Sequence, residues 1–291
     1  MTSPFKHRFL LGGRATSRIG LGSSYGLGTD GVLAAVDRGI NFLFWGLRRR
    51  AGFGKAIRQL GSSRRDDVTV AVQSYSRMAS LVGPSVETAL CRAKLDAFDL
   101  LVLGWWNGTP PERLRDAALK LKEAGKVKAI GISCHHRPTF EQFIADPTYD
   151  LIMLRYNAAH VGAESEVFPH LEKRRPTVLA FTATRWGSLM NPKHVPAGEQ
   201  VPTASDCYRF ALSNSNVDAC LAGPKNEAEL QGALDAVERG PMSPDELAWM
   251  RRVGVAVRAA KGGTRRVNPV KWADQMSGVT LEDKAEEEPP R

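Results

Sequence analysis

Short apolar runs alternate with amphipathic stretches along most of the chain. The runs are rich in Val, Ile, Leu, Phe and Ala, a composition typical of strands that are buried on both faces of a parallel sheet. A stretch with helical spacing of apolar positions follows each run, and such repeats predict a sheet covered by helices. We place strands at 18–23, 39–46, 68–73, 100–103, 129–133, 151–155, 178–182 and 219–222, and helices at 30–38, 54–60, 80–95, 111–124, 139–145, 164–173, 204–213 and 227–237.

Eight strand–helix units predict a protein of the α/β class with a closed (β/α)8 barrel. Before them, Gly12-Gly13 joins two short extended pieces in a predicted β-hairpin. After them, Ser243 caps one more predicted helix, which runs to about residue 258. We therefore expect one barrel domain over 1–259. Residues 260–291 lose the pattern, and we expect a disordered tail or one docked only through Trp272.

The composition fits a single large domain in a reducing compartment. The chain has 291 residues, 43% of them hydrophobic, with a net charge of +9 and a pI near 9.6. The basic residues lie in scattered pairs without a nucleic-acid motif, so we expect no nucleic-acid partner. None of the four cysteines forms a C-x-x-C pair, and no apolar run approaches the length of a membrane span. No secretory segment follows Met1, so the sequence predicts a cytoplasmic protein without a membrane partner.

The predicted strand ends carry large aromatic rings. The carboxyl ends of barrel strands usually hold the active site. Phe44 and Trp45 end the second strand, and Trp105 and Trp106 follow the fourth. The three tryptophans could form an aromatic wall for a planar or apolar ligand. They could equally plug a barrel mouth that has no polar groups, and the sequence leaves both interpretations open.

Groups that could move a proton lie at the same strand ends. His135, within Cys134-His135-His136, is a candidate acid or base because histidine titrates near neutral pH. This segment could also bind a metal, but consecutive side chains of an extended chain point to opposite sides, which favours chance neighbours. Tyr25 and Tyr75 follow the first and third strands. Either phenol could donate a proton, although loop packing is the ordinary role of such residues.

Three arginine positions could hold an anion. Arg155 ends the sixth strand, where a charge needs a partner or a ligand. Arg185 lies in the loop after the seventh strand and is the strongest single candidate for binding an anion. The Arg48-Arg49-Arg50 run after the second strand could clamp an anionic ligand, or it could be a solvated surface run.

Several motifs match one enzyme family. They are Ser17-Arg-Ile-Gly-Leu-Gly22, Asp37-Arg-Gly-Ile-Asn-Phe42, Gly125-Lys-Val-Lys-Ala-Ile-Gly-Ile-Ser133, Arg155-Tyr-Asn157 and Ser243-Pro-Asp-Glu-Leu247. With these motifs the chain resembles the aldo/keto reductases over about residues 8–257, as a divergent bacterial branch. The resemblance implies a (β/α)8 fold, an NADP(H) cofactor, and reduction of carbonyls through a tetrad of Asp, Tyr, Lys and His.

The tetrad itself is missing from this chain according to the resemblance. Phe44 stands at the Asp position, Gln73 at the Lys position and Gly104 at the His position. The Tyr position falls within 47–50, which contains no Tyr. Because all four positions have changed, the family's proton donor is not in its usual place.

The resemblance preserves more of a cofactor site than of a catalytic one. Ser133 keeps the hydroxyl aimed at the nicotinamide carboxamide, but Cys134 and Met153 replace the Asn and Gln that accompany it. Lys225 aligns with a basic residue that meets the 2′-phosphate of NADP. The residues expected at the cofactor are Ser133, Asn157, Phe181, Arg185, Gly187 and Lys225, and those expected around a substrate are Trp45, Trp105, Trp106 and Arg155.

Three functional hypotheses follow, each with a small-molecule ligand. The first is an NADP(H)-dependent oxidoreductase of aldo/keto reductase type with a rebuilt site, in which Tyr25, Tyr75 or His135 replaces the lost donor. The second is an inactive nucleotide-binding sensor or scaffold, since all four tetrad positions have lost their chemistry. The third is a non-redox enzyme acting on an anionic metabolite held by Arg155 and Arg185.

Overall fold

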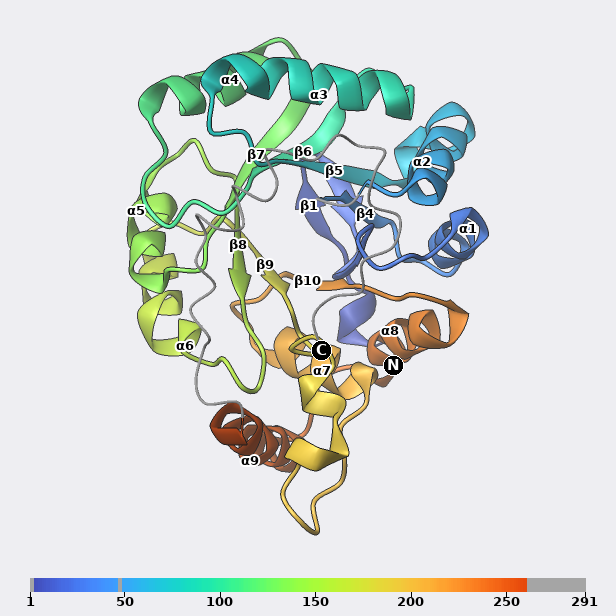
Figure 1. The fold of residues 1–291 in the computed structure, drawn as a ribbon, viewed down its shortest axis with the longest axis vertical. Coiled ribbons are helices and arrows are strands. Elements are labelled where there is room, and N and C mark those ends of the chain that lie inside the picture. The colour runs from blue at the N-terminus through green and yellow to red at the C-terminus, as the bar shows by residue number, and fades with distance from the viewer. Residues whose placement is uncertain (1–2, 47–48, 261–291) are drawn as a thin grey trace.

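The computed structural model describes residues 3–46 and 49–260, and its central feature is a closed barrel of parallel strands (Figure 1). The strands follow one another around the barrel in chain order, and the last pairs with the first to close it. They are β3 (Ile19–Gly22), β4 (Phe42–Trp45), β5 (Thr69–Ser74), β6 (Phe98–Leu103), β7 (Val127–Ser133), β8 (Leu151–Arg155), β9 (Thr177–Phe181) and β10 (Ala219–Ala222). The predicted (β/α)8 fold is confirmed.

Helices surround the barrel, as the alternating pattern predicts (Figure 1). Their apolar faces pack on the outward-facing side chains of the strands and form the larger of two core clusters. They are α1 (Thr29–Asp37), α2 (Ala51–Ser63), α3 (Ala79–Ala93), α4 (Glu112–Glu123), α5 (Phe140–Ala145), α6 (Ala163–Glu166), α7 (Ala204–Ser213), α8 (Glu227–Arg239) and α9 (Pro244–Ala260).

Two predicted helices differ from the structure for identifiable reasons. The expected helix over 164–173 is a single turn, α6, followed by a 3-10 helix, η4 (Phe168–Glu172). Pro169 lacks the N–H that an α-helix would need there, so the helix ends before it. The first helix begins at Thr29, one residue before the predicted start at residue 30. Gly28 is its N-cap, and the Thr29 hydroxyl donates to the Gly52 carbonyl (3.0 Å).

Side chains alternate between the barrel interior and the helix layer along each strand. In β4, Phe42 and Phe44 pack inside the barrel, whereas Leu43 and Trp45 belong to the outer core. The interior is packed with side chains rather than forming a pore. Its buried residues on the strands are Phe42, Phe44, Ala71, Leu100, Val102, Ala129, Leu151, Met153, Leu179 and Ala219.

The predicted hairpin, β1 (Phe9–Leu11) and β2 (Arg14–Thr16), covers the amino-terminal end of the barrel. Leu11 packs with the interior cluster, and Arg14 donates to Asp99 at the start of β6 (2.7 Å). Gly12 has φ +57°, and a Cβ there would lie 2.7 Å from the Asp99 carbonyl oxygen. The hairpin therefore closes the end opposite the one where the candidate site lies.

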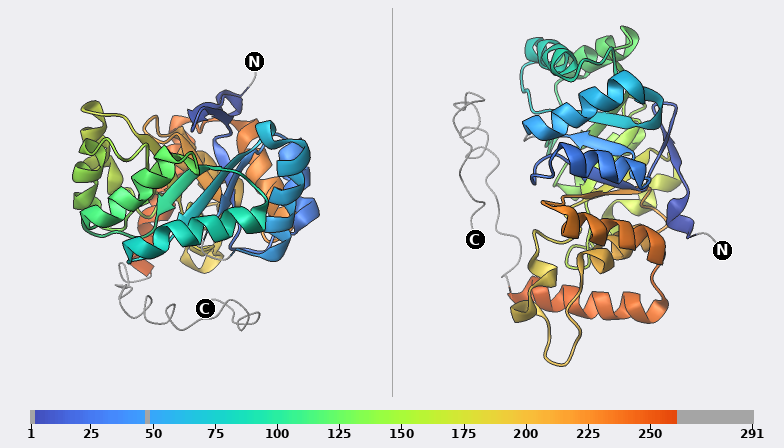
Figure 2. Two further views of the ribbon diagram at one scale, coloured as in Figure 1. Left: turned by 90° about the horizontal axis from the view of Figure 1, so that it is seen from above. Right: turned by 90° about the vertical axis from the view of Figure 1, so that its right-hand side faces the viewer.

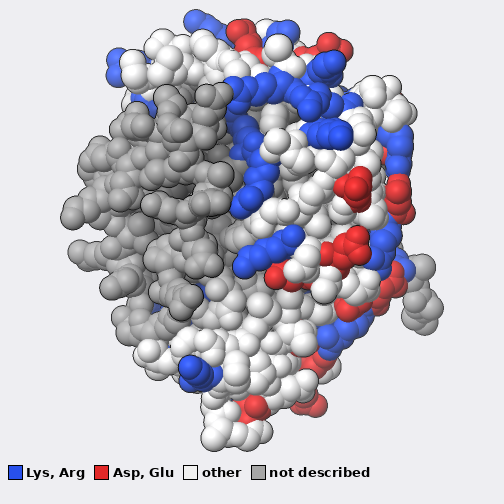
Figure 3. All heavy atoms as spheres, turned by 45° about the vertical axis from the view of Figure 1, so that its right-hand side comes forward, with Lys and Arg blue, Asp and Glu red and all other residues white. Residues whose placement is uncertain are grey.

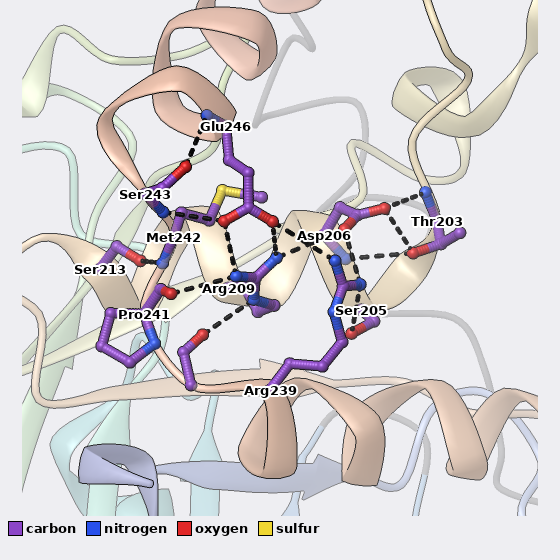
Figure 4. Close-up of polar contacts among 11 residues, drawn as sticks. Thr203, Ser205, Asp206, Arg209, Ser213, Arg239, Pro241, Met242, Ser243 and Glu246 are labelled. Carbon is purple, nitrogen blue, oxygen red and sulfur yellow. Dashed lines mark hydrogen bonds and ion pairs between the residues drawn. The ribbon is translucent and has the colours of Figure 1, made fainter.

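A buried charge cluster ties α7, α8 and α9 together (Figure 4). Arg209 of α7 is 4% exposed and donates to both carboxylate oxygens of Glu246 on α9, with Nη2 to Oε2 at 2.8 Å. Its Nε also donates to the Gly240 carbonyl (2.8 Å). Asp206, also on α7, accepts from Arg239 of α8 at 2.8 Å. These mutual bonds lower the pKa of Glu246 to about 2, mainly through Arg209.

The last described helix, α9, lies outside the ring beside α7 (Figures 1 and 2). Ser243 and Glu246 bond each other's backbone N–H, which confirms the predicted cap. Gly254 presses against the loop after β8, where a Cβ would lie 2.0 Å from the Ala158 carbonyl oxygen. Ala260 belongs to α9, so the helix runs one residue past the predicted domain boundary, and the remainder of the predicted tail, 261–291, falls outside the described residues. Of the helices described, none is long and apolar enough to span a membrane.

Candidate active site

The ring of Tyr75 occupies the space in which a side chain at position 104 would lie. Both residues directly follow barrel strands, Tyr75 after β5 and Gly104 after β6. A Cβ on Gly104 would lie 2.7 Å from Cδ1 of the Tyr75 ring and 3.1 Å from Nε2 of Gln73. Any larger residue at 104 would therefore displace the ring. Gly104 and Tyr75 form a complementary pair, since the ring fits only because position 104 carries no side chain.

A chain of hydrogen bonds links Tyr75 to Ser133 across three strand ends. The Tyr75 hydroxyl donates to Oε1 of Gln73 (2.8 Å), and Nε2 of Gln73 donates to Oγ of Ser133 (3.3 Å). Oγ of Ser133 also accepts from the backbone N–H of Trp105 (3.0 Å). Burial raises the pKa of the Tyr75 phenol, and nearby Arg49 opposes this only in part. The phenol therefore stays protonated at physiological pH.

An aromatic row continues from Tyr75 along the rim. The ring of Trp105 lies edge-on to Tyr75 at 5.6 Å and to His135 at 5.1 Å, and His135 lies edge-on to Phe181 at 5.5 Å. These four rings come from the ends of β5, β6, β7 and β9 and are partly exposed. We call Tyr75, Trp105, His135 and Phe181 the aromatic row. It forms a wall beside the barrel mouth.

Two predicted members of the substrate wall lie elsewhere. Trp45 is 3% exposed and faces the helices, and a Cβ on Gly54 of α2 would lie 3.0 Å from its ring. Because Phe44 points inward, strand alternation forces its neighbour outward, so the placement of Trp45 at the rim was wrong. Trp106 is half-buried beneath the guanidinium of Arg77, with Cζ 4.0 Å from the ring centroid. Only Trp105 of the three tryptophans belongs to the aromatic row.

His135 is a neutral hydrogen-bonding group rather than a general acid. Nη2 of Arg155 lies 3.1 Å from its Nδ1. Because a guanidinium can only donate, Nδ1 accepts and Nε2 carries the proton. Burial, followed by the charge of Arg155, lowers the pKa of His135 to about 4. The imidazole is therefore uncharged at neutral pH, which removes His135 as the substitute proton donor.

Arg155 lies among other cations at the end of β8. Burial lowers its pKa, and the charges of Arg137 and Arg185 lower it further. Its Cζ lies 5.6 Å from the ring centroid of Trp186, which is 62% exposed. Arg137 has an acidic partner, Glu166, at 2.7 Å. Arg155 itself forms no ion pair with any carboxylate of residues 3–46 and 49–260.

The loop after β9 has an unusual backbone. Thr182, Arg185 and Trp186 have φ between 51° and 58°, and Gly187 has φ +81°. Positive φ is uncommon for residues other than glycine and often occurs at ligand-binding sites. The Gly187 position is open, since a Cβ there would have no atom of the described residues within 4 Å, so glycine serves the conformation here. Arg185 is buried and donates to the Val257 carbonyl of α9 (2.7 Å), which ties this loop to that helix.

The other predicted cofactor residues occupy different environments. Asn157 is buried and braces the same loop, with Nδ2 donating to the Thr182 carbonyl (2.8 Å) and Oδ1 accepting from the Ala159 N–H (3.0 Å). Lys225 is exposed between β10 and α8, and its backbone N–H donates to Glu229 (2.9 Å). A contact of Lys225 with a phosphate stays a prediction.

Tyr25 follows β3, two strands before the strand that precedes Tyr75. Its ring covers Gly223 after β10, where a Cβ would lie 2.2 Å from the ring. The ends of β3 and β4 therefore lie between Gly223 and the Gln73 end of the hydrogen-bond chain in the strand order. Cys134 faces the helix layer, and burial raises its pKa to about 12. Within the described part of the chain, no three His, Cys, Asp or Glu side chains gather as metal ligands would.

Sequence reasoning missed the complementary pair and the role of Asn107. Oδ1 of Asn107 accepts from the His135 N–H (3.0 Å) and so fixes the loop that carries the imidazole. The available clue was the pairing of a glycine after one predicted strand, Gly104, with a bulky ring after the neighbouring strand, Tyr75. On the face shown in Figure 3, Lys and Arg are concentrated in the upper middle, whereas Asp and Glu are scattered over the top, right and lower parts.

Comparisons with known proteins agree with this fold. The model of the aldo/keto reductase family matches residues 32–254. The curated aldo-keto reductase YhdN of Bacillus subtilis (strain 168) is 28% identical over 206 residues, which cover 61% of this chain and 61% of YhdN.

Solved structures match over most of the chain. The holo form of aldo-keto reductase AKR11C1 from Bacillus halodurans has a TM-score of 0.73 and 18% identity, covering 89% of this chain and 98% of its own. An aldo/keto reductase from Klebsiella pneumoniae in complex with NADP and acetate has a TM-score of 0.71 and 18% identity, covering 89% of this chain and 96% of its own. At these identities the likeness establishes the fold.

Proposed function

Because this chain belongs to the aldo/keto reductase family, we propose that it is an NADP(H)-dependent oxidoreductase in which Tyr75 is the proton donor. The observation that carries this proposal is the chain of hydrogen bonds from Tyr75 through Gln73 to Ser133, beside Gly104. By the resemblance, Gln73 stands at the Lys position, Gly104 beside it at the His position, and Ser133 at the nicotinamide. The hydroxyl of Tyr75 next to these positions supports its role as the donor.

The phosphate end of a dinucleotide fits the loop after β9. Positive φ at Arg185, Trp186 and Gly187 turns this loop sharply. Successive backbone N–H groups in such turns can surround a phosphate. Arg185 and Lys225 would add positive charge, as would the exposed Arg258 at the end of α9. These residues would hold the phosphates of the cofactor.

The nicotinamide end fits through fewer groups. Oγ of Ser133 already accepts two hydrogen bonds, so its own proton is left to donate to the carboxamide oxygen. Phe181 offers a partly exposed ring for stacking. When bound, the reduced nicotinamide supplies a hydride to a carbonyl carbon, whose oxygen then takes a proton and becomes an alcohol.

To deliver that proton, the Tyr75 O–H would turn from Gln73 to the substrate oxygen, and the phenolate left behind would regain a proton from solvent. Gln73 orients the phenol by accepting its hydrogen bond, but a neutral amide does not lower the phenol pKa as a lysine cation would. Burial instead raises the pKa of Tyr75. The donor therefore stays protonated throughout the neutral and mildly alkaline range, and the reduction rate should not fall before about pH 10.

NADPH binding and turnover test this proposal. We expect saturable quenching of tryptophan fluorescence by NADPH and oxidation of NADPH with members of a carbonyl panel. Tyr75→Phe should lower turnover by about 100-fold or more with NADPH affinity nearly unchanged. Tyr149→Phe is the matched control, because it removes a buried hydroxyl that has no partner among the described residues. Equal turnover by wild type and Tyr75→Phe would reject Tyr75 as the donor, and absent NADPH binding would reject the function.

A nucleotide-binding barrel without turnover is the second candidate. The raised pKa of Tyr75 favours it, because a poorly acidic donor slows protonation. Saturable NADPH binding combined with no NADPH oxidation over the whole carbonyl panel would favour this candidate over the oxidoreductase.

A further inference from the structure

We propose that Arg155 and His135 bind the carboxylate of a substrate whose planar, apolar body lies along the aromatic row. This inference rests on the proposed function, since it names the class of carbonyl compound that the same mouth would accept. That class is an oxo acid with an aromatic or similarly flat apolar group. The site combines an unbalanced charge, two available donors and an apolar wall beside them.

The charge of Arg155 has no balance within the described residues. Its Nε is buried and has no hydrogen-bond partner there. The nearest charged groups that act on it are Arg137 and Arg185, which are also cations. A half-buried cation without a counter-charge is costly, and one surrounded by further cations more so. An anionic ligand would relieve this cost, and no side chain of residues 3–46 and 49–260 does.

Two donors at this place suit the two oxygens of a carboxylate. Nη2 of Arg155 donates to Nδ1 of His135, whereas Nη1 has no partner among the residues described. Nε2 of His135 carries the proton, and the one hydrogen bond of this ring within the described residues is through Nδ1. One charged and one neutral donor, joined by a hydrogen bond, present a fixed pair to an incoming anion.

The aromatic row gives the site its preference for a flat apolar body. His135 stands between Trp105 and Phe181, at 5.1 Å and 5.5 Å between ring centroids. Trp186 adds an exposed ring, whose centroid lies 5.6 Å from Cζ of Arg155. A small polar anion would accept from the two donors but leave these rings in contact with water. A carboxylate joined to a planar apolar group uses both features.

Benzoate and its neutral counterpart benzamide test the proposal on the full-length protein. We expect benzoate to raise Tm and to quench tryptophan fluorescence saturably, with benzamide binding at least about tenfold more weakly because it lacks the charge. Arg155→Gln should weaken benzoate binding by about 10- to 100-fold. Arg58→Gln is the control, since exposed Arg58 on α2 also removes one charge and contacts the Arg92 carbonyl rather than the aromatic row.

A second readout does not require a variant. Benzoate should raise the pKa of His135, because an anion beside Arg155 offsets the charge that helps to lower it. Proton NMR of the histidine ring would follow this titration. An unchanged His135 titration at saturating benzoate would overturn the proposed place of binding.

The remaining outcomes distinguish a failure of the carboxylate site from a failure of the proposed oxidoreductase function. Equal binding of benzoate and benzamide, or equal losses in Arg155→Gln and Arg58→Gln, would overturn the carboxylate site. So would a loss of NADPH affinity in Arg155→Gln without any benzoate binding, since Arg155 would then serve a cofactor phosphate. Benzoate binding that depends on Arg155 in a protein that binds no NADPH would keep the site and reject the oxidoreductase.

Discussion

Arg209, which is buried, and Arg155, which is half-buried, have opposite surroundings. Arg209 meets Glu246, Asp206 and two backbone carbonyls, so its charge is balanced and its donors are used. Arg155 meets a neutral imidazole, a tryptophan face and two further arginines. Burial of an arginine side chain thus stabilises the contact between helices in one place. In the other it leaves a positive charge that an anion would stabilise. A buried arginine indicates function when its counter-charge is missing.

The two arginines also differ in position. Arg209 lies between α7 and α9, away from the strand ends, where its bonds fix three helices to one another (Figure 4). Arg155 ends a barrel strand, at the edge where aldo/keto reductases and other barrels bind ligands. Stability and binding should therefore respond oppositely to changes at the two sites.

Removing Arg209 should have the largest effect on folding. Arg209→Met leaves Asp206 and Glu246 with only Arg239, so we expect a loss of about 3–5 kcal/mol in the free energy of unfolding, measured in urea. The control is Arg252→Met, whose exposed ion pair with Glu199 should cost at most about 1 kcal/mol. Equal losses in the two variants would show that the buried cluster has no special weight.

Adding a methyl group at Gly104 should cost less but act on the site. In Gly104→Ala the new Cβ would meet the Tyr75 ring at 2.7 Å, and overpacking of this kind costs about 1–3 kcal/mol. We expect turnover to fall together with stability, because the ring must move away from Gln73. Gly108→Ala, where a Cβ meets nothing within 4 Å among the described residues, should change neither. A fully active and stable Gly104→Ala would contradict the fit of Tyr75.

As the pH falls, two histidines should lower the stability of the protein before protonation of Glu246 affects the Arg209 cluster. Lowered pKa values of about 4 for His135 and about 3 for His160 mean that the unfolded chain binds protons first as the pH falls below 6.5. Stability should therefore fall from pH 6.5 towards pH 4, by at most about 1.4 kcal/mol per pH unit for each histidine. Glu246, with a pKa near 2, should begin to weaken the Arg209 cluster only below about pH 4.5. His135→Asn should flatten the first decline, and an unchanged slope would argue against burial of this imidazole.

Removing Arg155 should have the smallest effect on folding. Because Arg155→Gln deletes a cation without a counter-charge, we expect the free energy of unfolding to change by less than about 1 kcal/mol, in either direction. Urea unfolding in the absence of ligands measures this change. A loss as large as that of Arg209→Met would mean that Arg155 has a structural partner, which would remove the contrast between the two arginines.

Much of the fold could be predicted because it depends on local periodicity. Apolar strands, helical spacing and the glycine turns at Gly12 and Gly125 each act over a few residues, and the structure places a turn at both glycines. Strand alternation is equally local, and applying it to Phe44 would have directed Trp45 outward from the sequence alone.

The site was less predictable because it depends on contacts between residues far apart in the sequence. It also depends on which contacts a side chain does not make. That Tyr75 occupies the space beside Gly104 requires two strand ends to be placed to within an ångström. To predict that Arg155 has no carboxylate partner among the described residues, one would have to know every side chain around it. Burial and the charge of Arg155, which together lower the pKa of His135, follow from the same placement and could not be read from the sequence.

The pairing of β10 with β3 has a consequence for how the chain is made. Arg18, next to β3, donates to the Asp218 carbonyl 200 residues further along. At a synthesis rate of about 5–20 residues per second, the first strand waits roughly 10–40 s on the ribosome for its partner. Its unpaired edge is open to other chains throughout that time. The barrel closes only when β10 pairs with β3, so we expect chaperones to bind the nascent chain before β10 has been made.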